Sequence, residues 1–131
     1  MQHISKKESQ YSVIAAEAYK LIIDSGMNIE EAWQKSAQKH AGTISTRDKL
    51  CPKHTFLGLC YSGNLADIQK SIKIDNVNYQ YAKYAIAQWR INPNLSIAEM
   101  WRKVNLQFSK GAQNHNGQLH VVKGLWDHLL A

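Results

Sequence analysis

Apolar residues recur along most of the chain at intervals of three and four positions, the spacing that gives a helix one apolar face. Residues 28–40, 96–108 and 118–130 show this spacing most clearly, and no stretch alternates with a period of two between hairpin turns. We therefore predict an all-α domain, a compact bundle of about six helices. The positions expected on the apolar faces are Ile29, Ala32, Trp33, Ser36, His40, Ile97, Met100, Trp101, Val104, Phe108, Val122, Leu125, Trp126 and Leu129.

Several helix boundaries follow from local residue chemistry. Gly26 is expected to end the first helix, because glycine adopts the left-handed conformation of a C′ residue at little cost. Asn28 then caps the second helix. Pro93 interrupts the chain before Ser96 and Glu99, whose Ser-x-x-Glu spacing is that of a capping box.

The helical segments also predict an internal repeat. "NIEEAWQK" at 28–35 matches "SIAEMWRK" 68 positions later, and the same offset aligns Tyr11 with Tyr79. "HTFLGLC" from His54 matches "HVVKGLW" from His120. Two three-helix units, 8–63 and 76–131, would then share one core within a single domain of residues 1–131, because three short helices bury little alone. The alternative is a chance likeness between amphipathic helices.

Composition and charge indicate a globular protein without a membrane-spanning segment. Of the 131 residues 44% are hydrophobic, so the chain can bury a core. No apolar run is long enough to span a membrane, and no apolar segment follows the lysines near the first residue, so we expect a cytoplasmic protein. The net charge of +6 is dispersed rather than clustered, which is typical of a solvated surface.

The stretch "LCPKHTFLGLCYSG", residues 50–63, is the main candidate for chemistry. Proline suits the first position of a helix, so Pro52 is expected there, with Cys51 as the N-cap and Gly63 as the C′ residue. Cys51 and Cys60 are nine positions apart, about 180° around a helix, and so point to opposite sides. This geometry excludes a shared metal ion or a disulfide between them, and we expect no metal site and no cofactor.

Cys51 remains a candidate nucleophile. A thiolate at a helix N-terminus is stabilised by the helix dipole, and His54 lies three positions further on the same side. Lys53 is adjacent in sequence, and Cys60 is expected to be a buried thiol. If the two units pack about a twofold axis, His54 and His120 could line a shared cleft with Lys53 and Asn116. The alternative is that each histidine packs under its own helix.

The segments "CPKHTFLGLCYSG" and "NHNGQLHVVKGLW" resemble a small bacterial domain family of unknown function. In this chain Tyr61 and Ser62 replace an acidic pair of the family pattern, and Gly117 is an extra residue. The resemblance implies no activity. The matching positions are Cys51, Pro52, Lys53, Phe56, Leu57, Gly58, Leu59, Cys60, Gly63, Asn116, Gln118, Val121, Val122, Leu125 and Trp126.

These observations favour a non-enzymatic binding or protein-interaction domain, with a protein partner or a second copy of the chain. No phosphate-loop, dinucleotide-binding, zinc-protease or serine-hydrolase motif occurs. One alternative is a thiol- or histidine-dependent enzyme or a redox-sensitive site around Cys51, His54 and His120. Another is weak nucleic-acid binding through the basic surface.

Overall fold

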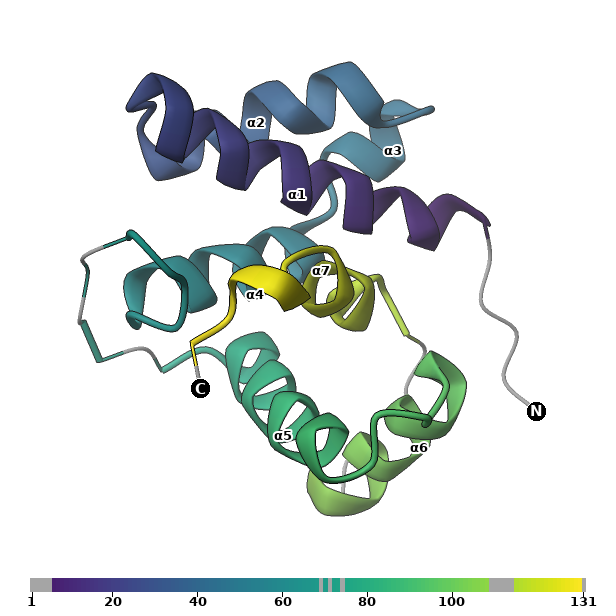
Figure 1. The fold of residues 1–131 in the computed structure, drawn as a ribbon. Coiled ribbons are helices and arrows are strands. Elements are labelled where there is room, and N and C mark those ends of the chain that lie inside the picture. Colours follow the sequence, from purple (N-terminus) through teal and green to yellow (C-terminus); the bar gives the residue numbers. More distant parts are fainter. Residues whose placement is uncertain (1–5, 69, 71, 74, 109–114, 131) are drawn as a thin grey trace.

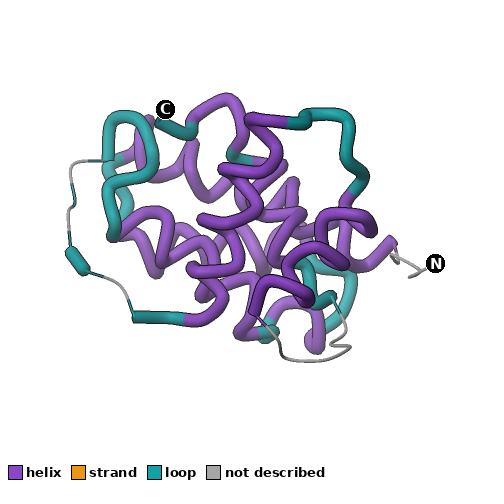
Figure 2. The backbone as a smooth tube through the Cα atoms, turned by 90° about the horizontal axis from the view of Figure 1, so that it is seen from below, coloured by secondary structure: helices purple, strands orange, loops and turns teal. Residues whose placement is uncertain are grey.

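The all-α prediction is confirmed by a computed structural model, which describes residues 6–68, 70, 72–73, 75–108 and 115–130. Within these ranges the chain forms helices and no strands, as the absence of orange in Figure 2 shows. The helices are α1 (Lys6–Ser25), α2 (Ile29–His40), the one-turn α3 (Ile44–Arg47), α4 (Leu50–Tyr61), α5 (Val77–Ile91), α6 (Ile97–Phe108), α7 (Gln118–Gly124) and the 3-10 turn η1 (Trp126–His128).

The helices lie in three tiers (Figure 1). The middle tier contains α4 and α7, which pack against each other. Above them lie α1, α2 and α3, and below them lie α5 and α6. Helix α1 packs against α2 and α7, while α4 packs against α5 and α7. Both helices of the middle tier therefore pack against helices outside their own half of the sequence.

The predicted helix boundaries at Gly26, Asn28 and Ser96 are confirmed. Gly26 follows α1 with φ of 66°, the left-handed conformation that glycine favours. The Asn28 side chain accepts hydrogen bonds from the first turn of α2. Ser96 and Glu99 form the reciprocal capping box: the Ser96 N–H donates to the Glu99 carboxylate and the Glu99 N–H donates to Ser96 Oγ, each at 3.0 Å.

Two glycines, Gly58 and Gly124, permit close helix crossings. A Cβ atom on Gly58 would lie 2.6 Å from Cβ of Tyr79, where α4 crosses α5. A Cβ atom on Gly124 would overlap the backbone oxygen of Ser12, where α7 crosses α1. Only glycine leaves room for these crossings. The duplication of units 8–63 and 76–131 stays a prediction.

The prediction of one helix over 118–130 is wrong after Gly124. There α7 ends, and η1 follows. The chain turns because its last residues pair with the segment after α4: the Ala66 N–H donates to the His128 carbonyl, and the Leu130 N–H donates to the Asn64 carbonyl, each at 2.9 Å. These two hydrogen bonds hold residues 128–130 against the connection between α4 and α5.

Candidate functional site

Helix α4 begins earlier than its sequence predicts. Its first residue is Leu50 and its N-cap is Lys49, so Cys51 is the second helical residue and Pro52 the third. The prediction of Cys51 as the N-cap is therefore wrong. Proline is tolerated throughout the first turn, where its missing N–H has no intrahelical partner, so its position fixes the start only approximately. Gly63, with φ of 83°, follows the C-cap as predicted.

The two cysteines have different environments. Cys60 is fully buried, and burial raises the pKa of its thiol far above the ordinary value, which makes it inert. Cys51 is half-buried, and its carbonyl accepts a 2.8 Å hydrogen bond from Thr55 Oγ1. Burial raises the pKa of the Tyr81 hydroxyl, which lies on α5.

His120 is buried beside another histidine. Its ring centroid lies 5.5 Å from that of His115, and among the described residues no ring contact joins it to His54. His115 is itself buried, and its Nε2 accepts a 3.0 Å hydrogen bond from the Leu119 N–H. His115 therefore caps the first turn of α7, a role that Gly117 at the N-cap position cannot fill. Sequence reasoning missed this role, because no capping motif has that spacing.

Asn116 and His54 take part in separate hydrogen-bond networks. The Asn116 N–H donates to Gln118 Oε1 at 2.8 Å, and Gln118 Nε2 donates to Asn78 Oδ1 at 3.1 Å. The carbonyl of the half-buried His54 accepts from Asn76 Nδ2 at 2.9 Å. Both networks connect helix ends to α5, so these contacts position the helices.

A concave surface, which we call the α2–α4 hollow, lies between α2, α3 and the first turn of α4. Its volume is about 280 Å³. Of the site residues predicted from sequence, Lys53 lines it, whereas Cys51, His54, Asn116 and His120 do not. The lining is mostly polar and consists of Trp33, Gln34, Gln38, Arg47, Asp48, Leu50 and Lys53.

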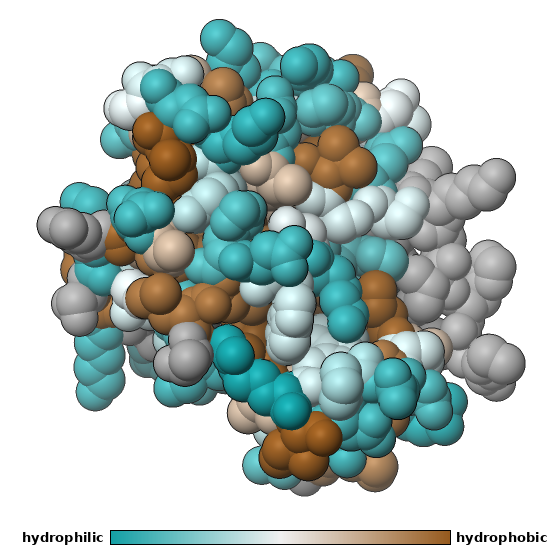
Figure 3. Space-filling view, viewed as in Figure 1, coloured by the Kyte–Doolittle hydropathy of each residue, from teal (hydrophilic) through white to brown (hydrophobic). Residues whose placement is uncertain are grey.

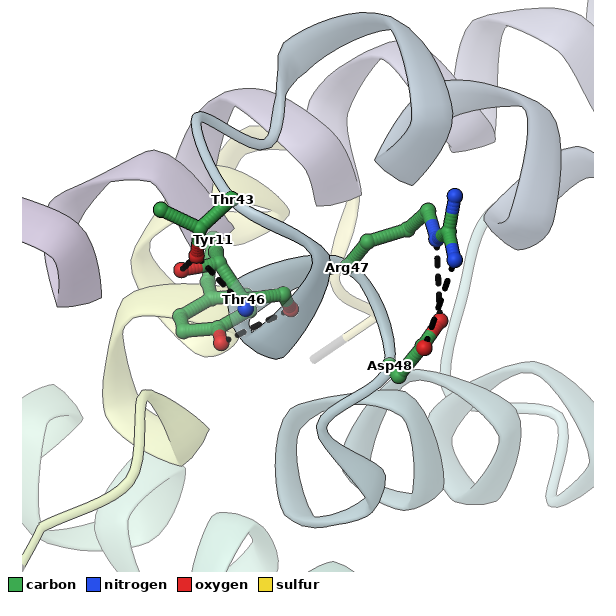
Figure 4. A network of polar contacts seen from close by, with 5 residues as sticks. All are labelled: Tyr11, Thr43, Thr46, Arg47 and Asp48. Carbon is green, nitrogen blue, oxygen red and sulfur yellow. Dashed lines mark hydrogen bonds and ion pairs between the residues drawn. The ribbon is translucent and has the colours of Figure 1, made fainter.

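Helix α3 is joined to α1 by one hydrogen bond and is capped by its own Thr43, both on the side away from Arg47 and Asp48 (Figure 4). The Tyr11 hydroxyl donates to the Thr46 carbonyl at 3.0 Å, and Thr43 Oγ1 accepts from the Thr46 N–H at 3.1 Å. On the opposite side of the turn, Arg47 and Asp48 extend between α2 and the start of α4. The short helix therefore holds these two charged side chains at the rim of the hollow.

Arg47 and Asp48 form an ion pair. Arg47 Nε donates to Asp48 Oδ1 at 2.9 Å, and a second guanidinium nitrogen donates to Oδ2 at 3.3 Å. The hydrogen bond with Arg47 lowers the pKa of the Asp48 carboxyl and raises that of Arg47, so both stay charged at neutral pH. Their side chains are 38% and 61% exposed, so the pair is solvated and open to exchange.

Trp33 contributes an unused hydrogen-bond donor. The residue is 2% exposed, and its indole Nε1 is shielded from solvent with no hydrogen-bond partner in the part of the chain that the structure describes. Buried donors are nearly always paired, so this one calls for an explanation. The periodicity predicts that Trp33 is buried, but not that it borders a hollow, which depends on where α3 and α4 pack.

A second hollow, of about 290 Å³, has a largely apolar lining at the end of α1 and the connection after α4. Figure 3 shows the face of the molecule seen in Figure 1, where hydrophobic residues form brown patches within a mostly hydrophilic surface. The lining residues of the second hollow are Ile22, Met27, Asn28, Ile29, Tyr61, Asp67, Ile68 and Lys70.

Comparison with known proteins identifies the family. A family model described as "Family of unknown function (DUF6979)" matches residues 8–130. The chain belongs to this family. No curated protein and no solved structure matches it. Across the described ranges, no helix of this DUF6979 member combines the length and apolarity needed to cross a bilayer.

Proposed function

We propose that the protein is a non-enzymatic binding domain that takes a small polar ligand in the α2–α4 hollow. The observation that carries this proposal is the lining of the hollow, which combines charged and amide groups with Trp33, whose buried indole N–H has no partner among the described residues. Ligand sites are concave and place a few polar groups so that they converge on the ligand. The hollow has that composition, and a ligand acceptor atom would satisfy the donor of Trp33.

The lining supports recognition better than catalysis. Nucleophilic catalysis needs a nucleophile and a base within hydrogen-bond reach. The described residues that line the hollow include no cysteine, serine, threonine or histidine, and the carboxylate of Asp48 is already bonded to Arg47. The thiol or histidine reading around Cys51, His54 and His120 stays an alternative hypothesis. Weak nucleic-acid binding stays a second alternative, based on the net charge of +6.

The proposal also includes a cytoplasmic location, a bacterial origin and a protein partner. Two free cysteines support a cytoplasmic location, because reducing compartments keep thiols unpaired. The likeness of residues 51–60 to a bacterial motif supports a bacterial origin. Binding of a protein partner or of a second copy is supported by large apolar side chains at the surface, such as Ile91 and Leu106, and light scattering at several concentrations tests self-association.

The experiment that tests the proposal is a fragment screen by ¹H–¹⁵N NMR on the full chain, with neutral, cationic and anionic fragments. We expect some fragments to shift the Trp33 indole resonance together with the backbone resonances of Gln34, Gln38 and Lys53. Shifts confined to Cys51, His54 and His120 would instead support the thiol or histidine hypothesis. A screen in which no fragment moves Trp33 would refute the proposed site.

A further inference from the structure

We infer that the ligand of the α2–α4 hollow is a small phosphate-type oxyanion, such as the terminal phosphate of a metabolite. This inference rests on the proposed function, since it names the chemistry of a ligand for the same hollow. Two properties of the lining support this inference, namely its net charge and the kind of hydrogen-bonding group that it presents. The first turn of α4, which also borders the hollow, adds to them.

The lining carries a net positive charge. Arg47 and Lys53 are cationic, and Asp48 is the one carboxylate in the lining. That carboxylate is already bonded to Arg47, and the guanidinium has five N–H donors, of which the ion pair uses two. A cation would meet a single carboxylate that is already neutralised, whereas an anion would meet Lys53 and the remaining donors of Arg47.

The buried hydrogen-bonding group of the hollow is a donor. The indole N–H of Trp33 can donate and cannot accept, and it has no partner among the described residues, so a ligand would pair with it through an acceptor atom and not through a donor. The exposed amides of Gln34 and Gln38 can also present N–H groups. An oxyanion supplies acceptors to all of these, while a cationic or donor-rich ligand would leave the Trp33 N–H unpaired.

The hollow also includes the first turn of α4. This 12-residue helix begins at Leu50, and its N-cap residue Lys49 makes no side-chain hydrogen bond to the first turn. A helix N-terminus carries a partial positive charge and unpaired N–H groups, which favour anions. In α4 these groups come from Leu50 and Cys51, because Pro52 has no N–H. This end of α4 adds to the charges of Arg47 and Lys53, and it carries no argument by itself.

A phosphate fits better than a carboxylate because the donors surround the hollow. Trp33 comes from α2, Arg47 from α3 and Lys53 from α4. A planar carboxylate suits one guanidinium, and Asp48 already fills that arrangement at Arg47. A phosphate has oxygens that point in several directions, so it can accept from all three helices at once.

The test is a titration of the full chain with inorganic phosphate at constant ionic strength, followed by the Trp33 indole resonance. We expect a saturable shift. Arg47→Gln and Lys53→Gln should each weaken binding about tenfold or more, the usual loss for a charge-assisted hydrogen bond. Asp48→Asn should strengthen binding several-fold, because it removes the competing carboxylate. Lys39→Gln is the matched control, since Lys39 lies on α2 outside the hollow and pairs with Glu17.

Several results would overturn the inference. One is the absence of a saturable phosphate shift in a folded protein, and another is an equal loss in Lys39→Gln and Arg47→Gln, which would indicate nonspecific attraction. Tighter binding of acetate, or of the diester dimethyl phosphate, would assign a carboxylate or a nucleic-acid backbone instead. If neutral amide fragments still shift Trp33 while phosphate does not, the inference fails and the proposed binding function stands.

Discussion

Trp33 and Trp101 occupy matching positions in the two halves of the chain, yet their surroundings differ. Both lie on the apolar face of a helix of 12 residues, and both are almost completely buried. Trp101 meets the ring of Tyr81 edge-on at 5.5 Å and the ring of His115 at 5.0 Å. Trp33 packs on Phe56 at 5.1 Å, and it also borders the α2–α4 hollow.

The difference shows that one sequence pattern can border a packed core at one end of a molecule and a polar hollow at the other. Around Trp101, aromatic rings from α5 and from His115, in the segment before α7, contact the indole. Beside Trp33, the turn α3 and the start of α4 bring Arg47 and Lys53, which are polar and leave a concave space. The candidate site therefore lies where polar side chains from α3 and α4, and not aromatic rings, lie beside the tryptophan.

The largest loss of stability is expected when the indole side chain of Trp33 or Trp101 is removed. Trp101→Ala should lower the free energy of unfolding by about 3–5 kcal/mol, the usual range for a buried aromatic residue. Trp33→Ala should fall at the lower end of that range, because the residue borders a hollow where neighbouring side chains have room to relax. Urea denaturation of both variants measures the difference. A larger loss for Trp33→Ala would contradict the comparison.

The next largest loss of stability is expected when a methyl group is added at the two helix crossings. Gly124→Ala and Gly58→Ala should each cost about 1–3 kcal/mol from overpacking, with Gly124→Ala the larger because its methyl meets the backbone of Ser12. Gly42→Ala is the control, since its Cβ would meet the end of the Gln10 side chain at 3.3 Å. Thermal unfolding should rank the three variants in that order. Equal midpoints would show that the crossings can shift freely.

The two helix caps give a smaller and more even effect. Asn28→Ala and Ser96→Ala should each cost about 1 kcal/mol, because each removes an acceptor for the first-turn N–H groups of α2 or α6. Chemical denaturation of both variants tests this. Since the caps occupy matching positions, a cost confined to one of them would mean that only that helix depends on its cap.

The smallest expected effect is a pH dependence of stability that comes from Glu99, in the capping box of α6. The hydrogen bond from the Ser96 N–H lowers the pKa of Glu99 in the folded chain, with Arg102 contributing less. A lowered folded-state pKa means that this stabilisation is present above the unfolded-state pKa and is lost as pH falls through the folded value. The stability difference between wild type and Glu99→Gln should therefore shrink in acid. A difference that stays constant with pH would contradict this role of Glu99.

Local features of the sequence predicted most of the fold, while the candidate site depends on tertiary packing. Gly26, Asn28 and the Ser96–Glu99 pair act within one helix turn, so their roles could be predicted from spacing alone. The start of α4 was misplaced because Pro52 is tolerated at more than one position in a first turn. The hollow brings together Trp33 and Arg47, which are distant in sequence, and no spacing rule relates them.

The most direct test of the central claim compares the Trp33 and Trp101 indole ¹⁵N resonances in one sample during a phosphate titration. Trp33→Phe and Trp101→Phe variants assign the two signals. We predict that the Trp33 resonance shifts saturably and that the Trp101 resonance stays in place. A titration in which neither resonance moves, or in which both move equally without saturation, would contradict a phosphate site in the α2–α4 hollow.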